Sequence, residues 1–89
     1  MIKGTYDRQA DALAIRLAAP GVAIARTQAF SDDVILDLAA DGTIATVEIL
    51  GVSTRPDVGE ILRLLGIDPD AVVFTRIGTG RPWRPAFLR

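Results

Sequence analysis

The chain has 89 residues, 49% of them hydrophobic, and a formal net charge of −1, a composition that predicts one small folded domain rather than a disordered segment. It contains neither histidine nor cysteine, which excludes thiolate–imidazole zinc sites and every nucleophilic mechanism that needs an imidazole base. No apolar run approaches the roughly 20 residues of a membrane span, and no signal peptide follows Lys3, so we expect a cytoplasmic protein that does not enter the membrane.

Short alternating segments separated by turn residues predict strands through the first half of the chain. The expected strands cover residues 2–6, 12–17, 22–30, 34–38 and 43–50. Alternation of apolar with small or polar side chains is typical of a strand that is buried on one face. Asp41-Gly42 suits a hairpin turn because a positive φ angle costs little there. The close spacing of these segments favours an antiparallel meander.

The period of the apolar residues changes after residue 54. The residues that fall on one helical stripe are Val58, Ile61, Leu62 and Leu65. They predict a helix over residues 55–65 that packs on one face of the sheet. Thr54 and Asp57 resemble a capping box at its start, and Gly66 is a stop signal at its end. We therefore expect an α+β fold, with four or five antiparallel strands, one main helix and a C-terminal extension.

The opening of the chain also carries a family resemblance. The Tyr6-Asp7 start, the Ala-Asp-Ala-Leu step over residues 10–13, the Asp41-Gly42 turn and the strand end over residues 47–50, followed by Ser53, occur in that order. In this order they resemble the YuzE-like family of small bacterial proteins (domain of unknown function 2283). The resemblance covers residues 1 to about 54. It implies an antiparallel sheet packed by a helix, and it implies no reaction, because none is established for the family.

The chain departs from the family pattern after Gly66. We therefore expect residues 1–66 to form a YuzE-like α+β domain and residues 67–89 to form a C-terminal extension of the same single domain. Residues 71–77 have a β-rich centre and could add a strand to the sheet. Residues 78–89 are predicted to be irregular, because they contain two glycines and two prolines.

Four acidic residues occupy the family-like positions: Asp7, Asp11, Asp37 and Glu48. If the strands pair around the Asp41-Gly42 turn, the carboxylates of Asp37 and Glu48 could lie close together. Paired carboxylates can hold a Mg²⁺-type ion, with Asp7 or Asp11 assisting. The alternative, which we favour, is that Asp7 and Asp11 stabilise turns through backbone N–H groups.

Arginines offer a second explanation for the acids on the strands. Asp37 and Glu48 can pair with Arg16 and Arg26 across the solvent face, in contacts worth about 0–1 kcal/mol each. We favour this explanation too, so the sequence predicts no metal, no cofactor and no catalytic residue.

Charge divides unevenly along the chain. Residues 1–70 hold all 11 acidic side chains and six of the 10 basic ones, a net charge of −5, whereas residues 71–89 hold four arginines and no acid, a net charge of +4. An acidic body with a basic tail can bind a second copy of itself or another acidic surface. The alternative is that the arginines keep an apolar tail in solution.

The tail carries the predicted partner-binding residues, which are Arg81, Trp83, Arg84 and Phe87. Tryptophan and arginine are enriched at interface hot spots, and Pro82 and Pro85 favour an extended segment that could lie along a partner. The alternative is that Trp83 and Phe87 fold back onto their own sheet. Nucleic-acid binding is not expected, because four arginines face a body of net charge −5.

Three functions remain open from the sequence. The first, which we favour, is a non-enzymatic interaction module that self-associates as a homo-oligomer, most simply a dimer, with the tail contacting the neighbouring subunit. The second is a metal-dependent enzyme that uses the carboxylates of Asp37 and Glu48. The third is an antitoxin-like component of a two-gene module that binds a cognate protein partner.

Overall fold

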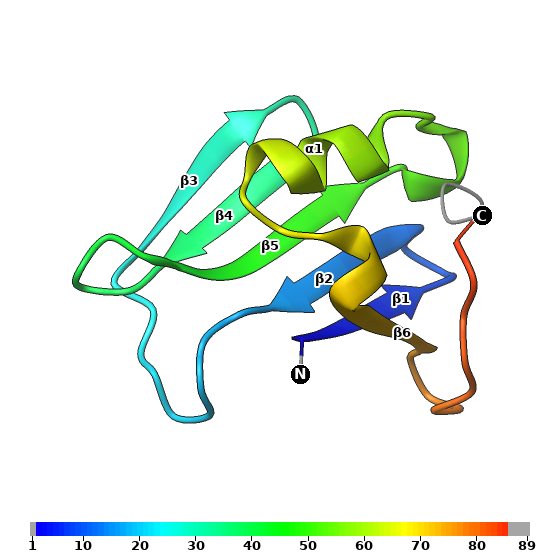
Figure 1. The fold of residues 1–89 in the computed structure, drawn as a ribbon, viewed down its shortest axis with the longest axis horizontal. Helices are drawn as coiled ribbons and strands as arrows, with labels where there is room; N and C mark the ends of the chain where they lie inside the picture. The colour runs from blue at the N-terminus through cyan, green and yellow to red at the C-terminus, as the bar shows by residue number, and fades with distance from the viewer. Residues whose placement is uncertain (1, 86–89) are drawn as a thin grey trace.

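Six strands of residues 2–85, the part of the chain that the computed structural model describes, form one sheet (Figure 1). In chain order they are β1 (Ile2–Asp7), β2 (Ala12–Arg16), β3 (Arg26–Ser31), β4 (Val34–Leu38), β5 (Ile44–Leu50) and β6 (Val72–Arg76). Their order across the sheet is β3-β4-β5-β2-β1-β6. All neighbours run antiparallel except β1 and β6, which are parallel. With helix packed against this sheet the fold is α+β, which confirms the predicted class.

The sheet departs from the predicted antiparallel meander of four or five strands. β3, β4 and β5 do form a meander, and β1 and β2 form a hairpin. The hairpin inserts between β5 and β6, however, so β2 pairs with β5 rather than with β3. The sixth strand comes from the β-rich segment near residue 74, and its parallel pairing with β1 requires a long connection that carries the chain back along the sheet.

Helix α1 (Val58–Leu64) lies across one face of the sheet (Figure 1). It is shorter than the predicted helix because Asp57 is its N-cap and Leu65 its C-cap. The predicted capping box is wrong: the Asp57 side chain makes no capping hydrogen bond and instead pairs with Arg55. Gly66 has a φ angle of 80° and ends the helix as predicted.

Two short 3-10 helices flank α1, namely η1 (Val52–Thr54) and η2 (Pro69–Ala71). The carboxylate of Asp68 accepts a hydrogen bond from the backbone N–H of Asp70 and so caps η2. None of the helices within residues 2–85 is both long and apolar enough to cross a membrane.

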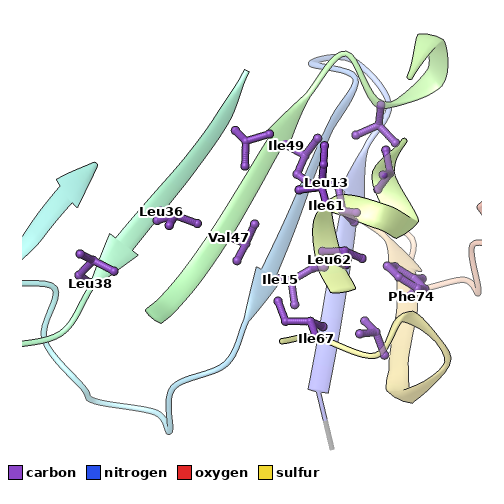
Figure 2. Close-up of a cluster of buried hydrophobic side chains, with 14 residues drawn as sticks. Leu13, Ile15, Leu36, Leu38, Val47, Ile49, Ile61, Leu62, Ile67 and Phe74 are labelled. Atoms are coloured by element: carbon purple, nitrogen blue, oxygen red, sulfur yellow. The ribbon is translucent and has the colours of Figure 1, made fainter. Parts of the chain in front are cut away.

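The hydrophobic core fills the space between α1 and the sheet (Figure 2). Leu13, Ile15, Val47 and Ile49 come from the two central strands, and Leu62 reaches them from α1; all five are completely buried. The alternation that predicted β2 and β5 therefore identifies the face that carries the core. Burial of side chains of this size stabilises the fold by roughly 1.5–3 kcal/mol each before conformational entropy is counted.

The opposite face of the sheet points away from α1. We call it the open sheet face, and it takes two or three residues from each strand: Lys3, Thr5, Asp7, Ala12, Ala14, Arg16, Thr27, Ala29, Ile35, Asp37, Thr46, Glu48, Leu50, Val73 and Thr75. Each of these side chains is exposed or half-buried. Most of them are polar or small, and none belongs to the buried core.

Candidate functional site

The C-terminal segment returns to the sheet after β6. Pro82 forms an isolated bridge with Thr75, and the backbone N–H of Trp83 donates to the carbonyl oxygen of Phe74 at 3.0 Å. The indole of Trp83 stacks on the ring of Tyr6, with centroids 4.2 Å apart and planes 5° apart, and meets Phe74 edge to face at 5.7 Å. The structure thus places Trp83 on its own sheet. Phe87, also predicted to bind a partner, lies outside the described residues.

Tyr6 belongs at the same time to a hydrogen-bonded cluster that joins the first hairpin to η1. The Tyr6 hydroxyl donates to Oδ1 of Asp11 at 2.8 Å. The hydroxyl of Ser53 donates to Oδ2 of Asp11 at 2.6 Å, and its backbone N–H donates to Oδ1 at 3.1 Å. Asp11 has a φ angle of 50°, a left-handed conformation that a short polar side chain tolerates.

The cluster shifts the pKa values of its two acidic groups in opposite directions. Hydrogen bonds from Ser53 and then from Tyr6 lower the pKa of Asp11. The hydrogen bond to Asp11, followed by burial, raises the pKa of Tyr6. Asp11 is therefore ionised and Tyr6 protonated at neutral pH. A carboxylate stabilised in its charged form by several donors is a weak proton acceptor, so the arrangement favours binding and structure over acid–base chemistry.

Arg55 is fixed next to this cluster by three hydrogen bonds. Its Nε and one terminal nitrogen donate to the two carboxylate oxygens of Asp57, at 3.1 and 3.3 Å. Its other terminal nitrogen donates to the backbone carbonyl of Asp32 at 2.8 Å. The salt bridge raises the pKa of Arg55 and lowers that of Asp57. A two-point contact of this kind orients the guanidinium plane as well as its charge.

A hollow of about 290 Å³ lies between the tail and the cluster. Tyr6 and Trp83 supply aromatic lining, Arg55 and Arg84 supply guanidinium groups, and Ser53 supplies a hydroxyl. We call it the Trp83 hollow. It brings together three separate parts of the chain: the end of β1, the segment after β5 and the returning tail.

The acidic residues considered as metal ligands lie apart from this hollow. The Asp7 carboxylate accepts from the backbone N–H groups of Gln9 and Ala10, at 3.0 and 3.4 Å, as expected of a turn residue. Asp37 accepts from the Thr27 hydroxyl at 2.7 Å. Within residues 2–85 no three acidic side chains come close enough together to hold a metal ion.

Asp37 and Glu48 do share the open sheet face, but they are diagonal rather than opposite neighbours. Asp37 pairs with Thr46, and Glu48 pairs with Ile35 on β4 and with Ala14 on β2. The predicted ion pairs with Arg16 and Arg26 are absent, since the described residues contain a single salt bridge, Arg55–Asp57. Neither acid therefore has a cationic partner among residues 2–85.

Sequence reasoning identified some residues of the Trp83 hollow and of the hydrogen-bonded cluster beside it, and missed others. It singled out Tyr6 and Asp11 for the family-like opening and Trp83 and Arg84 for their residue types. It did not connect them, because Asp11 and Ser53 are separated by 42 positions and no local pattern reports such a contact. Arg55 was missed for the same reason.

A family model described as "Protein of unknown function (DUF2283)" matches residues 3–53. The matched segment contains the first five strands, except Ile2 at the start of β1, together with Tyr6, Asp11 and Ser53. Comparisons with curated proteins and with solved structures give no match.

Proposed function

The chain belongs to the DUF2283 family of proteins of unknown function, and we propose that it acts as a non-enzymatic interaction module that self-associates as a homodimer. The observation that carries the proposal is the open sheet face, where, apart from Asp7 at the end of β1, acidic and basic side chains lie on opposite halves. We further propose that the module works in the cytoplasm of a bacterial cell, on the sequence grounds given above.

Apart from Asp7 at the end of β1, charge on the open sheet face is divided about the middle of the sheet. Asp37 and Glu48 lie on β4 and β5, whereas Arg16 and Lys3 lie on β2 and β1. The register puts Asp37, Thr46, Arg16 and Lys3 side by side in one row across the four strands. One half of the row is therefore acidic and the other half basic, with the boundary between β5 and β2.

A twofold axis along that boundary would make the face complementary to itself. Rotation by half a turn about an axis parallel to the strands places β4 opposite β1 of a second copy and β5 opposite β2. Asp37 of one copy then faces Lys3 of the other in the same row, twice per dimer. Glu48 faces Ala14, beside Arg16 of the second copy. The arrangement is isologous, which is the common symmetry of homodimers, and aligned packing of two sheets is an established geometry.

Small side chains permit the close approach that such a dimer needs. Ala14 is exposed on β2, next to the proposed axis, and Ala29 is exposed on the edge strand β3. Val73 adds an apolar contact on the other edge strand, β6. Six strands about 4.8 Å apart, with five residues each at about 3.3 Å, give a footprint of roughly 500 Å² per copy. The total of roughly 1,000 Å² is near the lower limit for a specific interface. We therefore expect a weak dimer that depends on concentration and salt.

The tail is a less favourable interface than the sequence alone indicates. Trp83, its main predicted anchor, already stacks on Tyr6, and freeing it for a partner would expose Phe74. The two other functions considered gain no specific observation: the carboxylates do not gather among residues 2–85, and no feature identifies a cognate partner. We therefore place the interface on the open sheet face.

Charge reversal tests the proposal. We expect Asp37→Lys and Lys3→Glu each to weaken the dimer about tenfold, because each puts like charges opposite one another twice per dimer. Mixing the two variants should restore association, since the heterodimer again has opposite charges at both positions. Sedimentation equilibrium over a range of protein and salt concentrations measures all three.

Glu60→Lys is the matched control, because it makes the same change of charge on the exposed surface of α1. It should leave the dissociation constant within about twofold of the wild type. A wild-type protein that stays monomeric at millimolar concentration would refute the dimer. A dimer that both reversals leave unchanged would place the interface elsewhere.

A further inference from the structure

We propose that the Trp83 hollow binds a small aromatic anion, meaning a planar ring that carries a carboxylate or a phosphate group. The hollow lies on the side of the sheet that holds α1 and is separate from the open sheet face. The inference therefore stands independently of the proposed dimer.

The charge of the lining favours an anion. Two guanidinium groups, those of Arg55 and Arg84, line the hollow, and no carboxylate does. Asp11 is bonded to two of the lining residues, but it already accepts from the hydroxyls of Tyr6 and Ser53 and from a backbone N–H. Its negative charge is thus stabilised by its own donors, so it opposes a bound anion less than a carboxylate without donors would.

Arg55 is oriented before any ligand arrives. Three of the five N–H donors of its guanidinium are engaged by Asp57 and by the carbonyl of Asp32. The remaining donors are held in a fixed direction, so little side-chain entropy is lost when they bind an oxyanion. Asp57 neutralises the charge of Arg55 but leaves this hydrogen-bonding capacity.

Arg84 supplies the uncompensated positive charge. Its side chain is exposed and forms no ion pair within residues 2–85. It lies next to Trp83 in the chain, and both residues line the hollow. An oxyanion between Arg84 and Arg55 would therefore receive charge-assisted hydrogen bonds from two sides, the usual pattern for carboxylate and phosphate recognition.

The aromatic lining favours a ring next to the anion. Tyr6 and Trp83 are held rigid by their mutual stacking and by Phe74, and Val52 and Pro85 add apolar surface. A volume of about 290 Å³ is at the small end of ligand sites, so the ligand is a compact ring system. The adjoining hollow of about 470 Å³ is less suitable, because Asp70 lines it and Arg84 is its only cation.

Binding can be followed through Trp83, since it is the only tryptophan of the chain. We would titrate the full-length protein with benzoate, adenosine monophosphate and inorganic phosphate, using calorimetry and Trp83 fluorescence. Benzoate and the nucleotide distinguish the carboxylate source from the phosphate source, and inorganic phosphate tests the anion without a ring. We expect saturable binding of at least one aromatic anion, at least about tenfold tighter than that of inorganic phosphate.

The decisive variants are Arg84→Ala and Arg81→Ala, two exposed arginines of the same tail, of which Arg84 alone lines the hollow. Arg84→Ala should weaken binding about tenfold or more, and Arg81→Ala should change it less than about twofold. Absence of saturable binding to both aromatic anions, equal effects of the two variants, or inorganic phosphate binding as tightly as the nucleotide would each overturn the proposal. Asp37→Lys should leave binding unchanged, so failure of the dimer and failure of the ligand site can be told apart.

Discussion

Asp11 is the residue through which the turn of the first hairpin contacts the segment after β5. Its carboxylate accepts from Tyr6 within the hairpin and from Ser53 after β5, and its backbone carbonyl accepts from the N–H of Val52 at 3.2 Å. The left-handed backbone of Asp11 points the side chain toward η1. A single aspartate thereby attaches the β1–β2 turn to the segment that leads into the helix.

The pKa of Tyr6 tests this contact, because Tyr6 is the only tyrosine of the chain. The hydrogen bond to Asp11 raises that pKa from its usual value of 10.0. The bond therefore stabilises the fold below pH 10, and its contribution is lost as the pH rises through the higher value in the folded protein. We expect ultraviolet absorbance to show tyrosinate forming above pH 10 in the wild type and at lower pH in Asp11→Asn.

Asn keeps a short polar side chain at the positive φ angle but lacks the negative charge. The variant therefore measures the effect of the carboxylate charge on the pKa of Tyr6. Circular dichroism at each pH checks that the protein stays folded during the titration. A wild-type midpoint at or below the usual tyrosine value would contradict the predicted contact, as would identical midpoints in the two proteins.

At the scale of the elements, β1 packs closely against β6 at Gly4. It has β2 on one side and β6 on the other, and Gly4 lies directly opposite Phe74 of β6. A Cβ atom added at Gly4 would come within 2.8 Å of the Phe74 ring and 3.1 Å of the Val72 side chain. Phe74 thus occupies the space that a side chain at position 4 would need.

Gly4→Ala is expected to destabilise the protein by about 1–3 kcal/mol, because Phe74 must shift to admit the methyl group. Urea denaturation followed by circular dichroism measures the change in the free energy of unfolding. Thr5→Ala is the control, since Thr5 lies in the same strand but on the open sheet face, and it should cost much less. Equal stability of Gly4→Ala and the wild type would show that Phe74 does not pack over this position.

The sequence predicted the strands and the helix well, because strand alternation and the helical stripe of apolar residues are each contained in a short stretch of chain. Alternation of Leu13 and Ile15 located β2, and the stripe of Val58, Ile61 and Leu62 located α1. Pairing between distant strands has no such signal: nothing near Ala12 indicates that β2 pairs with β5, and nothing near Ile2 indicates a parallel partner 70 residues away. β3 starts at Arg26 rather than Val22, because residues 22–25 do not pair with β4 as a strand.

The candidate site was partly predictable for the same reason. Residue type alone drew attention to Trp83 and Arg84, and the turn role of Asp7 follows from its neighbours. The stacking of Trp83 on Tyr6 and the bonds from Ser53 to Asp11 depend on where the whole sheet places these segments. Local sequence carries no information on either.

On the scale of the whole molecule, the returning tail covers one end of the core. Trp83 is half-buried against Tyr6 and Phe74, and Pro85 is fully buried. Residues beyond the family-matched segment therefore complete the packing of strands that belong to it. The tail is part of the fold up to Pro85 at least.

Trp83→Ala is expected to lower the free energy of unfolding by about 2–4 kcal/mol, because it removes two aromatic contacts and leaves Phe74 uncovered. Arg81→Ala, an exposed position in the same segment, should have almost no effect. Thermal and urea denaturation of the two variants measure the difference. Unchanged stability of Trp83→Ala would show that the tail does not pack on the sheet in solution, and the dimer, formed by the other face, should persist in both variants.

The position of β1 between the hairpin partner β2 and the last strand has a consequence for synthesis. The ribosome makes β1 first and β6 last of the strands, so for most of translation β1 has one neighbour and one unpaired edge. β3, β4 and β5 can pair as soon as they emerge, whereas the parallel pair must wait until Arg76 has left the exit tunnel. A product that terminates before β6 would present β1 as a bare strand edge, with Gly4 uncovered, which is the kind of edge that recruits other chains. Protection of the β1 edge from other chains therefore depends on synthesis of the last strand, β6.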